Sequence, residues 1–445
     1  MTLALDADLL HAVSQSVEAQ LGLHYPRERW ADLERGLNGA ATELGFDSTE
    51  KCARQLILAR LSRPQVDSLA SHLTIGETYF FRDAAAFEIL QELVQEKRSR
   101  GKQLRIWSAG CCTGEEPYSI AISLRRLIPD LDDWQITILG TDINLHFLQK
   151  AAEGVYGEWS FRGVPEETRN AWFRPTKDGR SELLPAIRKM VTFDYLNLVE
   201  DVFPSLANIT NAMDLIFCRN VLMYFSPAQL RKVVASFHRS LVEGGRLIVS
   251  ATEASRESFA ELTPGGMPNV ALYRKIPPGS PRPAAIETPP IPVPVRLPEP
   301  PPRAAKKKTQ RLAVRRNHAA DARRLANEGK LAEALAACDR ALAEDRLVPG
   351  HHYLRGVILL EQNATESAVT ALQRALFLDH DFVLAHFTLG HLRLRQGRTA
   401  DAARAFANAR SLLRSCAPET VLPESDGITA GRLLAILTST EEALA

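Results

Sequence analysis

The chain has 445 residues, which predicts about three domains at roughly 150 residues each. Hydrophobic residues make up 45% and charged residues 24% of it, as in soluble globular proteins, and this excludes a fibrous or largely disordered protein. The formal net charge is only +1, so the average composition gives no reason to expect a nucleic acid or an anionic membrane as partner.

The ends and the cysteines of the chain predict a cytoplasmic protein. No apolar run approaches the roughly 18 residues that cross a bilayer, and the N-terminus carries acids where a signal peptide needs basic residues. We therefore expect no membrane insertion. The six cysteines are scattered, without a C-x-x-C pair or a partnering His cluster, which argues against a structural zinc and against disulfides. We expect no bound metal.

The first part of the chain predicts a helical subdomain at residues 1–98, because apolar residues such as Leu9, Val13 and Val17 recur at helical spacing. Short apolar runs then alternate with helical segments. This alternation predicts an α/β domain at 99–276, with a parallel sheet covered by helices on both faces. The predicted strands lie at residues 104–110, 134–143, 191–198, 213–225 and 244–251.

A proline-rich segment divides the chain, since 12 of the 26 prolines fall in residues 277–302. Such a segment favours polyproline II and acts as a semi-rigid spacer, with an SH3-domain ligand as the less favoured alternative. Residues 303–324 carry nine Lys or Arg against one acid, so this segment is +8 and the remainder −7. A basic arm can bind nucleic acid or acidic lipid, but without interleaved aromatic residues we favour a solvated linker end. We assign the linker to 277–316.

Residues 317–445 are rich in Ala and Leu at helical spacing, and they repeat every 34 residues. Positions that share the register are Ala334, Ala368 and Ala402, and likewise Gly329, Asn363 and Gly397. This period is typical of tetratricopeptide repeats, which bind peptides or proteins on a concave face. We expect three repeats, a capping helix at 425–445, and a protein or peptide partner.

A turn of small residues follows the first predicted strand, in the run IWSAGCCTGEE at 106–116. Open α/β folds bind ligands at this end of the sheet, and Gly110 and Gly114 let the backbone approach a ligand. The spacing differs from the G-x-G-x-x-G of pyrophosphate binders. Asp142 ends the second strand, where an acid accepts hydrogen bonds from ribose, or else caps the helix beginning at Asn144. A nucleoside-bearing cofactor is predicted.

Five runs occur in order along the chain: TIGETYFFRD (74–83), SAGCCTGEEPYSIA (108–121), TDI (141–143), FDYLNL (193–198) and FCRNVLMYF (217–225). Together they resemble the CheR family of chemotaxis-type protein-glutamate methyltransferases, over about residues 5–276. The resemblance implies a Rossmann-like sheet that binds S-adenosyl-L-methionine. It also implies methylation of glutamate side chains on the cytoplasmic domain of a membrane-bound chemoreceptor, in chemosensory adaptation. The linker and repeats resemble a subclass that includes enzymes of surface behaviour.

The resemblance also implies roles for the residues of the first three runs. Thr78 and Arg82 would help to close the cofactor pocket. Glu115 would lie beside the glycine turn, and Asp142 would hold the ribose. Gly76 stands where the family often has Asn, which puts one cofactor contact in doubt.

In the later runs, Asn197 and Leu198 would flank the adenine. Arg219 and Asn220 would face the reactive sulfonium. Among all these positions we expect Arg82 and Asn220 to be catalytic. The full set of expected cofactor contacts is Gly76, Thr78, Arg82, Glu115, Asp142, Asn197, Leu198, Arg219 and Asn220.

The implied reaction needs little acid–base chemistry. A glutamate carboxylate has a pKa near 4.3, so it is already a nucleophile at neutral pH and needs no general base. By loose analogy, Arg105 or Tyr273 would orient this carboxylate. Two alternatives stay open: a methyltransferase of another substrate class, and an inactive scaffold whose repeats bind signalling proteins.

The segment 153–192 interrupts the alternation, and Asp178-Gly179 within it is a strong hairpin turn. In the family this region forms a small β-subdomain that can grip a receptor's C-terminal tether peptide. The hairpin here is shorter and has fewer glycines than in tether-binding members. We therefore expect recognition of the receptor without such a tether.

Overall fold

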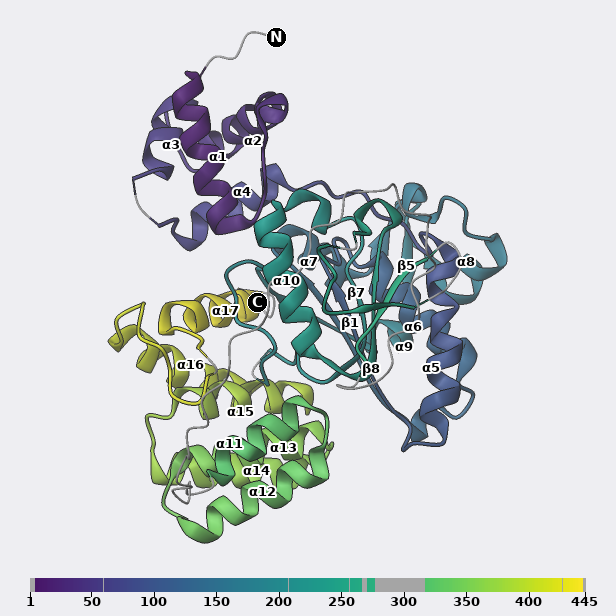
Figure 1. The fold of residues 1–445 in the computed structure, drawn as a ribbon, viewed down its shortest axis with the longest axis vertical. Coiled ribbons are helices and arrows are strands. Elements are labelled where there is room, and N and C mark those ends of the chain that lie inside the picture. Colours follow the sequence, from purple (N-terminus) through teal and green to yellow (C-terminus); the bar gives the residue numbers. More distant parts are fainter. Residues whose placement is uncertain are drawn as a thin grey trace, which may run out of the picture.

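The computed structural model describes residues 5–58, 60–206, 208–255, 257–265, 270–276, 317–425 and 427–442. The proposed linker at 277–316 lies outside these ranges. Figure 1 shows a small helical bundle, a sheet domain and a second group of helices along the long axis. None of the helices in these ranges is long and apolar enough to cross a membrane.

The centre is a seven-stranded sheet in the order β6-β2-β1-β7-β8-β10-β9. Its strands are β1 (Gln103–Ala109), β2 (Gln135–Asp142), β6 (Val191–Tyr195), β7 (Met213–Phe217), β8 (Leu241–Val249), β9 (Thr263–Pro264) and β10 (Ala271–Arg274). The helices packed around it are α5 (Ile89–Arg98), α6 (Glu115–Leu127), α7 (Leu145–Glu153) and α10 (Pro227–Ser240).

Both faces of the sheet are covered because side chains of a strand alternate between faces. On β1, Ile106 packs in one core with residues of α5 and α6, while its neighbour Trp107 packs in another with Phe237 of α10. In Figure 1 these helices lie on opposite sides of the strands.

The sheet is mixed, which corrects the expectation of a parallel sheet. Strands β6, β2, β1, β7 and β8 are parallel, but β10 pairs antiparallel with β8, and β9 pairs antiparallel with β10. A parallel return needs a long crossover, usually a helix. The described residues between β8 and β10 form only a 3-10 turn, at Ala251–Glu253, and the short strand β9.

A separate three-stranded sheet, in the order β3-β5-β4, occupies the inserted segment. Its strands are β3 (Val155–Tyr156), β4 (Phe173–Pro175) and β5 (Ser181–Leu183). The same segment contains the short helices α8 (Glu166–Trp172) and α9 (Pro185–Arg188). The hairpin of β4 and β5 closes where the Thr176 N–H donates to the Arg180 carbonyl at 2.9 Å. Gly179 has a φ of 80°, which favours glycine there.

Four helices form the N-terminal bundle: α1 (Ala7–Leu21), α2 (Trp30–Glu43), α3 (Thr49–Leu56) and α4 (Arg63–Leu73). Their apolar faces share a core that ends at Leu73. The bundle is joined to the sheet domain where the His24 N–H donates to the Tyr224 carbonyl at 2.7 Å, and where Asn144 Nδ2 donates to Thr74 Oγ1 at 2.9 Å. These contacts fix the bundle over the carboxyl ends of the strands.

The C-terminal region is helical: α11 (His318–Asn327), α12 (Leu331–Glu344), α13 (Pro349–Glu361), α14 (Thr365–Leu378), α15 (Val383–Arg395), α16 (Thr399–Ser415) and α17 (Ala430–Glu442). Helices α12, α14 and α16 begin at intervals of 34 residues, the period of the sequence pattern. Small residues let the paired helices approach, since a Cβ at Gly356 would lie 2.9 Å from Leu372.

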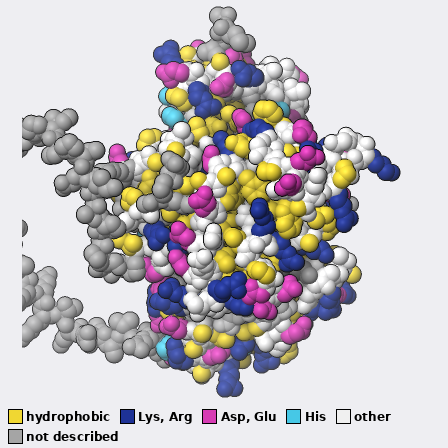
Figure 2. Space-filling model, turned by 90° about the vertical axis from the view of Figure 1, so that its right-hand side faces the viewer, with side chains coloured by type: hydrophobic (Ala, Val, Ile, Leu, Met, Phe, Trp, Pro, Cys, Tyr) yellow, Lys and Arg dark blue, Asp and Glu magenta, His cyan; other side chains and the backbone are white. Residues whose placement is uncertain are grey.

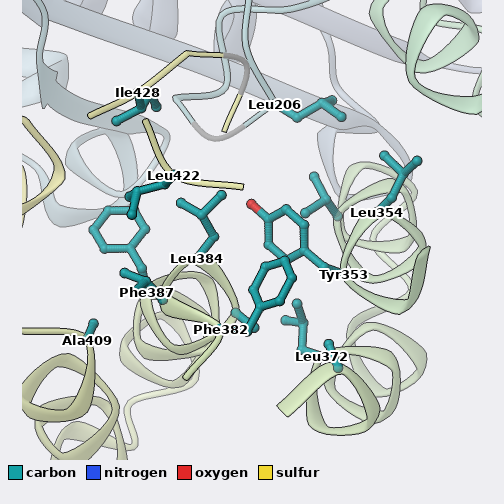
Figure 3. Packing of buried hydrophobic residues seen from close by; sticks show 14 of the residues in the cluster. Leu206, Tyr353, Leu354, Leu372, Phe382, Leu384, Phe387, Ala409, Leu422 and Ile428 are labelled. Carbon is teal, nitrogen blue, oxygen red and sulfur yellow. The ribbon is translucent and has the colours of Figure 1, made fainter. Parts of the chain in front are cut away.

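The C-terminal helices touch the sheet domain. Leu206, from the loop between β6 and β7, is buried in the same core as Tyr353 and Leu354 of α13, as Figure 3 shows. The two parts on either side of the proline-rich segment therefore pack against each other through described residues. On the face in Figure 2, acidic and basic side chains are interspersed, so this face has no large field of one sign.

Candidate functional site

A pocket opens at the carboxyl ends of β1, β2, β6 and β7. In the sheet, β1 lies between β2 and β7, and open α/β sheets bind ligands at such a reversal of strand order. The pocket is lined mainly by residues of the loop at 74–83 and of the turns that follow these four strands.

The glycine turn forms the floor of this pocket. The N–H groups of Gly110 and Cys111 donate to the Thr141 carbonyl at 2.7 and 2.9 Å, which ties the end of β1 to the end of β2. Gly110 has a φ of 75°, and a Cβ there would lie 2.3 Å from Cγ2 of Val221. Only glycine fits this position without displacing the opposite wall.

Asp142 lines the pocket at the end of β2 and is buried. Its Oδ2 accepts from the Cys112 N–H at 2.8 Å, and its Oδ1 accepts from the Asn144 N–H at 2.9 Å. Burial raises the pKa of this carboxyl to about 6. The cap of α7 is Asn144, whose Oδ1 accepts from the N–H groups of His146 and Phe147. Capping therefore does not account for Asp142.

Arg219 connects three walls of the pocket. Its Nη1 donates to Glu116 Oε2 at 3.0 Å, and its Nη2 donates to the Arg82 carbonyl at 2.8 Å and pairs with Asp83. The Arg219 side chain is only 3% exposed. It therefore holds the loop at 74–83 against α6.

That loop supplies Thr78 and Arg82 to the pocket wall, and Arg82 Nη1 donates to the Glu77 carbonyl at 2.9 Å. Gly76, an expected cofactor contact, is not among the lining residues. A Cβ at this position would lie 2.7 Å from the ring of Phe147, which itself lines the pocket. The Phe147 ring fills the space beside position 76.

Glu115 also lies outside the pocket wall. Its buried carboxylate accepts from Thr113 Oγ1 at 2.7 Å and from Ser160 Oγ at 2.9 Å, and burial raises its pKa. Glu115 thus ties the glycine turn to the inserted segment at Ser160. The next residue, Glu116, lines the pocket instead, because successive residues of a helix point about 100° apart.

Asn197 and Leu198 line the pocket just after β6. The amide of Asn197 is used within the protein, since its Nδ2 donates to the Gln20 carbonyl at 2.7 Å and its Oδ1 accepts from the Val199 N–H at 3.0 Å. Asn197 therefore joins the pocket to helix α1.

Asn220 and Arg219 follow β7 and both line the pocket. Asn220 has a φ of 60°, and its buried Oδ1 has no hydrogen-bond partner within the described part of the chain. Buried polar atoms are normally paired, so this oxygen is an acceptor available to a bound molecule.

Glu253 was missed from the sequence and holds this turn in place. Its Oε2 accepts from the N–H groups of Asn220 and Ser250, both at 2.9 Å, and its Oε1 accepts from the Met223 N–H at 3.2 Å. The available signal was the S-x-x-E pattern of a capping box at Ser250, which the structure contains. Nothing in that pattern indicates the contact with Asn220.

Neither residue proposed to orient the substrate carboxylate reaches the pocket, which corrects both assignments. Arg105 lies near the start of β1, at the end of the strands opposite to the pocket. Its Nε donates to the Asn211 carbonyl at 3.2 Å. Tyr273 stacks on Phe259 with ring centroids 4.3 Å apart. In the described ranges no three His, Cys, Asp or Glu side chains gather to hold a metal ion.

Comparison with known proteins places these residues in a family. Residues 76–263 match the CheR methyltransferase, SAM binding domain. The chain is 31% identical over 412 residues to the probable biofilm formation methyltransferase WspC of Pseudomonas aeruginosa, covering 87% of this chain and 95% of that protein. It is 37% identical over 196 residues to chemotaxis protein methyltransferase 2 of Vibrio cholerae, covering 43% and 67%.

Among solved structures, the S-adenosylmethionine-bound amino pentose methyltransferase CalS10 of Micromonospora echinaspora matches 38% of this chain and 50% of its own. The identity is 15% and the TM-score 0.22.

The pocket fits S-adenosylmethionine on its own chemistry. It offers a buried carboxylate at Asp142, a buried oxygen on Asn220 that no described residue bonds to, and a glycine turn that leaves room for a ligand. The matches to WspC and to the Vibrio enzyme cover most of their lengths. This chain belongs to the CheR methyltransferase family and is an S-adenosylmethionine-dependent protein methyltransferase.

Proposed function

We propose that this enzyme methylates glutamate side chains on the cytoplasmic domain of a membrane-bound chemoreceptor, forming methyl esters in chemosensory adaptation. The observation that carries the proposal is the match to proteins named chemotaxis protein methyltransferases, together with the family match over residues 76–263, which hold most of the pocket lining. We further propose that the protein acts in the cytoplasm.

The pocket supports a reaction that needs positioning rather than a base. When bound, S-adenosylmethionine supplies a methyl group on a positively charged sulfur. A glutamate carboxylate is already ionised at neutral pH. Of the three lining acids, Glu77 is paired with Arg162, Glu116 is paired with Arg219, and Asp142 accepts two backbone hydrogen bonds. The residues of the chain therefore have to bind, orient and exclude water.

We assign Asp142 to the ribose, and Asn197 and Leu198 to the adenine. Arg82 and Asn220 are the residues we place beside the reacting groups, because both line the pocket. Arg82 lies on the loop that follows the N-terminal bundle and keeps partial contact with solvent, as a residue facing an incoming protein substrate must. Arg219, Glu115 and Glu253 are positioning residues in this proposal.

We propose four parts for the chain: a helical subdomain at 1–98, the methyltransferase domain at 99–276 with its insertion at 153–192, a linker at 277–316, and tetratricopeptide repeats at 317–445. The 34-residue interval between helices α12, α14 and α16 supports the repeats. Such arrays bind proteins or peptides, so we propose a second protein partner there.

We also propose that the receptor is recognised without a tether peptide. In support, the edge strands of the inserted sheet, β3 and β4, have only two and three residues, which leaves little edge for a peptide to pair with. Adding a receptor's own C-terminal peptide in excess should therefore leave methyl transfer unchanged, and inhibition by that peptide would contradict this point.

Transfer of labelled methyl from the cofactor to receptor-enriched membranes tests the proposed function. The wild-type enzyme should give base-labile label, and Arg82→Ala should give little. Arg355→Ala is a matched control, because Arg355 bonds to Asp339 within the C-terminal helices at 2.8 Å. If the protein binds the cofactor but labels no receptor, the scaffold alternative is favoured. If the label appears on another class of protein, a methyltransferase of another substrate class is favoured.

A further inference from the structure

The loop between β6 and β7 is shared by the cofactor pocket and the C-terminal helices. Its first residues, Leu196, Asn197 and Leu198, line the pocket. Farther along, Leu206 is buried among the C-terminal helices, as Figure 3 shows. One continuous segment therefore connects two parts of the chain that are separated by the linker in sequence.

An ion pair anchors this loop close to the pocket. Arg432, in the first turn of α17, donates through Nη2 to Asp201 Oδ2. The same Oδ2 atom accepts from the backbone N–H of Asn197 at 2.5 Å, and the Asp201 N–H donates back to the Asn197 carbonyl at 2.9 Å. A side chain of the C-terminal region is thus linked to a residue of the pocket wall through a single carboxylate, that of Asp201.

The pair is shielded from solvent, since the Arg432 and Asp201 side chains are 21% and 8% exposed. The Arg432 guanidinium also lies over the ring of Tyr195 at 4.3 Å, and Tyr195 directly precedes the pocket segment. Removing one partner of a shielded pair leaves the other charge without compensation, which costs more than the pair itself contributes. Asp201 would then be free to leave the Asn197 N–H.

A second ion pair joins the same two parts away from the pocket. Arg105 pairs with Glu361 at the end of α13, and Arg105 also donates to the carbonyls of Ile209 and Asn211 near the far end of the loop. Its side chain and that of Glu361 are 7% and 8% exposed. This pair contributes to docking but has no contact with the residues at 196–201 in the described structure.

We propose that Arg432 is a positioning residue for the cofactor site: through Asp201 it fixes the backbone of Asn197, so the C-terminal region sets the affinity for S-adenosylmethionine. Because coupling between two sites is reciprocal, cofactor binding also tightens the docking of α17 on the methyltransferase domain. The inference rests on the proposed cofactor contacts of Asn197 and Leu198. It does not depend on the proposed receptor substrate.

The test measures the dissociation constant of S-adenosylhomocysteine by calorimetry on the full chain. Arg432→Ala should weaken binding about tenfold, which corresponds to about 1.4 kcal/mol. Arg432→Lys should recover most of the affinity, because the cation is kept. Glu361→Gln loosens the same docking surface at the other ion pair and should change affinity less than twofold. In transfer assays, Arg432→Ala should raise the KM for S-adenosylmethionine and leave kcat near wild type.

Three results would overturn the proposal. The first is wild-type affinity for S-adenosylhomocysteine in a folded Arg432→Ala protein, which would show that Arg432 does not affect the cofactor site. The second is an equal loss of affinity in Arg432→Ala and Glu361→Gln, which would reflect docking of the C-terminal helices in general. Failure of the Lys variant to recover affinity would remove the role of the charge. A Leu198→Ala variant separates the assumptions: if it too binds normally, the proposed cofactor contact is wrong and the inference falls with it.

Discussion

Lowering the pH from 7 to 5 should weaken cofactor binding about tenfold, because the proposed ribose acceptor Asp142 becomes protonated. Burial raises the pKa of this carboxyl to about 6. About nine-tenths of it is then ionised at pH 7 and about one-tenth at pH 5, and the apparent dissociation constant scales inversely with the competent fraction. A protonated carboxyl cannot accept two ribose hydroxyls as well as the N–H groups of Cys112 and Asn144.

Calorimetric titration with S-adenosylhomocysteine at pH 5 and 7, at matched ionic strength, checks this expectation. The Asp142→Asn variant should bind weakly at both values and lose the pH dependence. That variant separates the effect of Asp142 from that of Asp194 on β6, whose pKa is also raised to about 6 by burial. The pKa of the Cys112 thiol is raised, so it stays neutral throughout. An unchanged dissociation constant between the two pH values, or a full tenfold change in Asp142→Asn, would refute the reasoning.

The same burial has a consequence for the unliganded protein. A carboxyl whose pKa is raised on folding favours the folded state most at low pH. The contribution of Asp142 is fully present below its unfolded pKa of 3.8 and is lost as the pH rises through about 6. Bound cofactor offsets this loss near neutral pH.

Two substitutions probe the framework of the pocket. Gly110→Ala should destabilise the protein by about 2–4 kcal/mol in chemical denaturation, from the left-handed backbone and the contact with Val221, and an unchanged midpoint would contradict the packing. Glu253→Gln should cost about 1.5–3 kcal/mol, because an amide NH₂ would face backbone N–H groups, and should lower methyl transfer at least tenfold. Its control is the exposed Glu257→Gln; equal activity of both variants would remove the role of Glu253.

Local patterns in the sequence were enough to predict the centre of the site. Gly110 follows β1 and Asp142 ends β2, and because these strands are parallel their carboxyl ends bring the two residues together. It was harder to predict which side of α6 faces the pocket. Glu115 and Glu116 are the first two residues of this helix, and only its packing decides that Glu116 lines the pocket. Gly76 was predicted to contact the cofactor, but it does not line the pocket, because the ring of Phe147 fills the space beside it.

Contacts over long sequence distances could not be predicted. Glu253 lies 33 residues from Asn220, and its apparent role as a local cap hides its contact with the pocket turn. Arg105 was expected near the substrate, yet its partner Glu361 lies beyond the linker. The pairing of Arg432 with Asp201 crosses the same boundary. The last two contacts depend on how separately formed units dock, which hydrophobic periodicity does not encode.

The most direct measurement of the proposed function is mass spectrometry of a chemoreceptor's cytoplasmic domain after incubation with the enzyme and S-adenosylmethionine. The account predicts the mass increment of a methyl ester on specific glutamates, its loss on mild base treatment, and its absence with Arg82→Ala. Base-stable methylation on another residue type, or an unmodified receptor beside an enzyme that binds the cofactor, would contradict it.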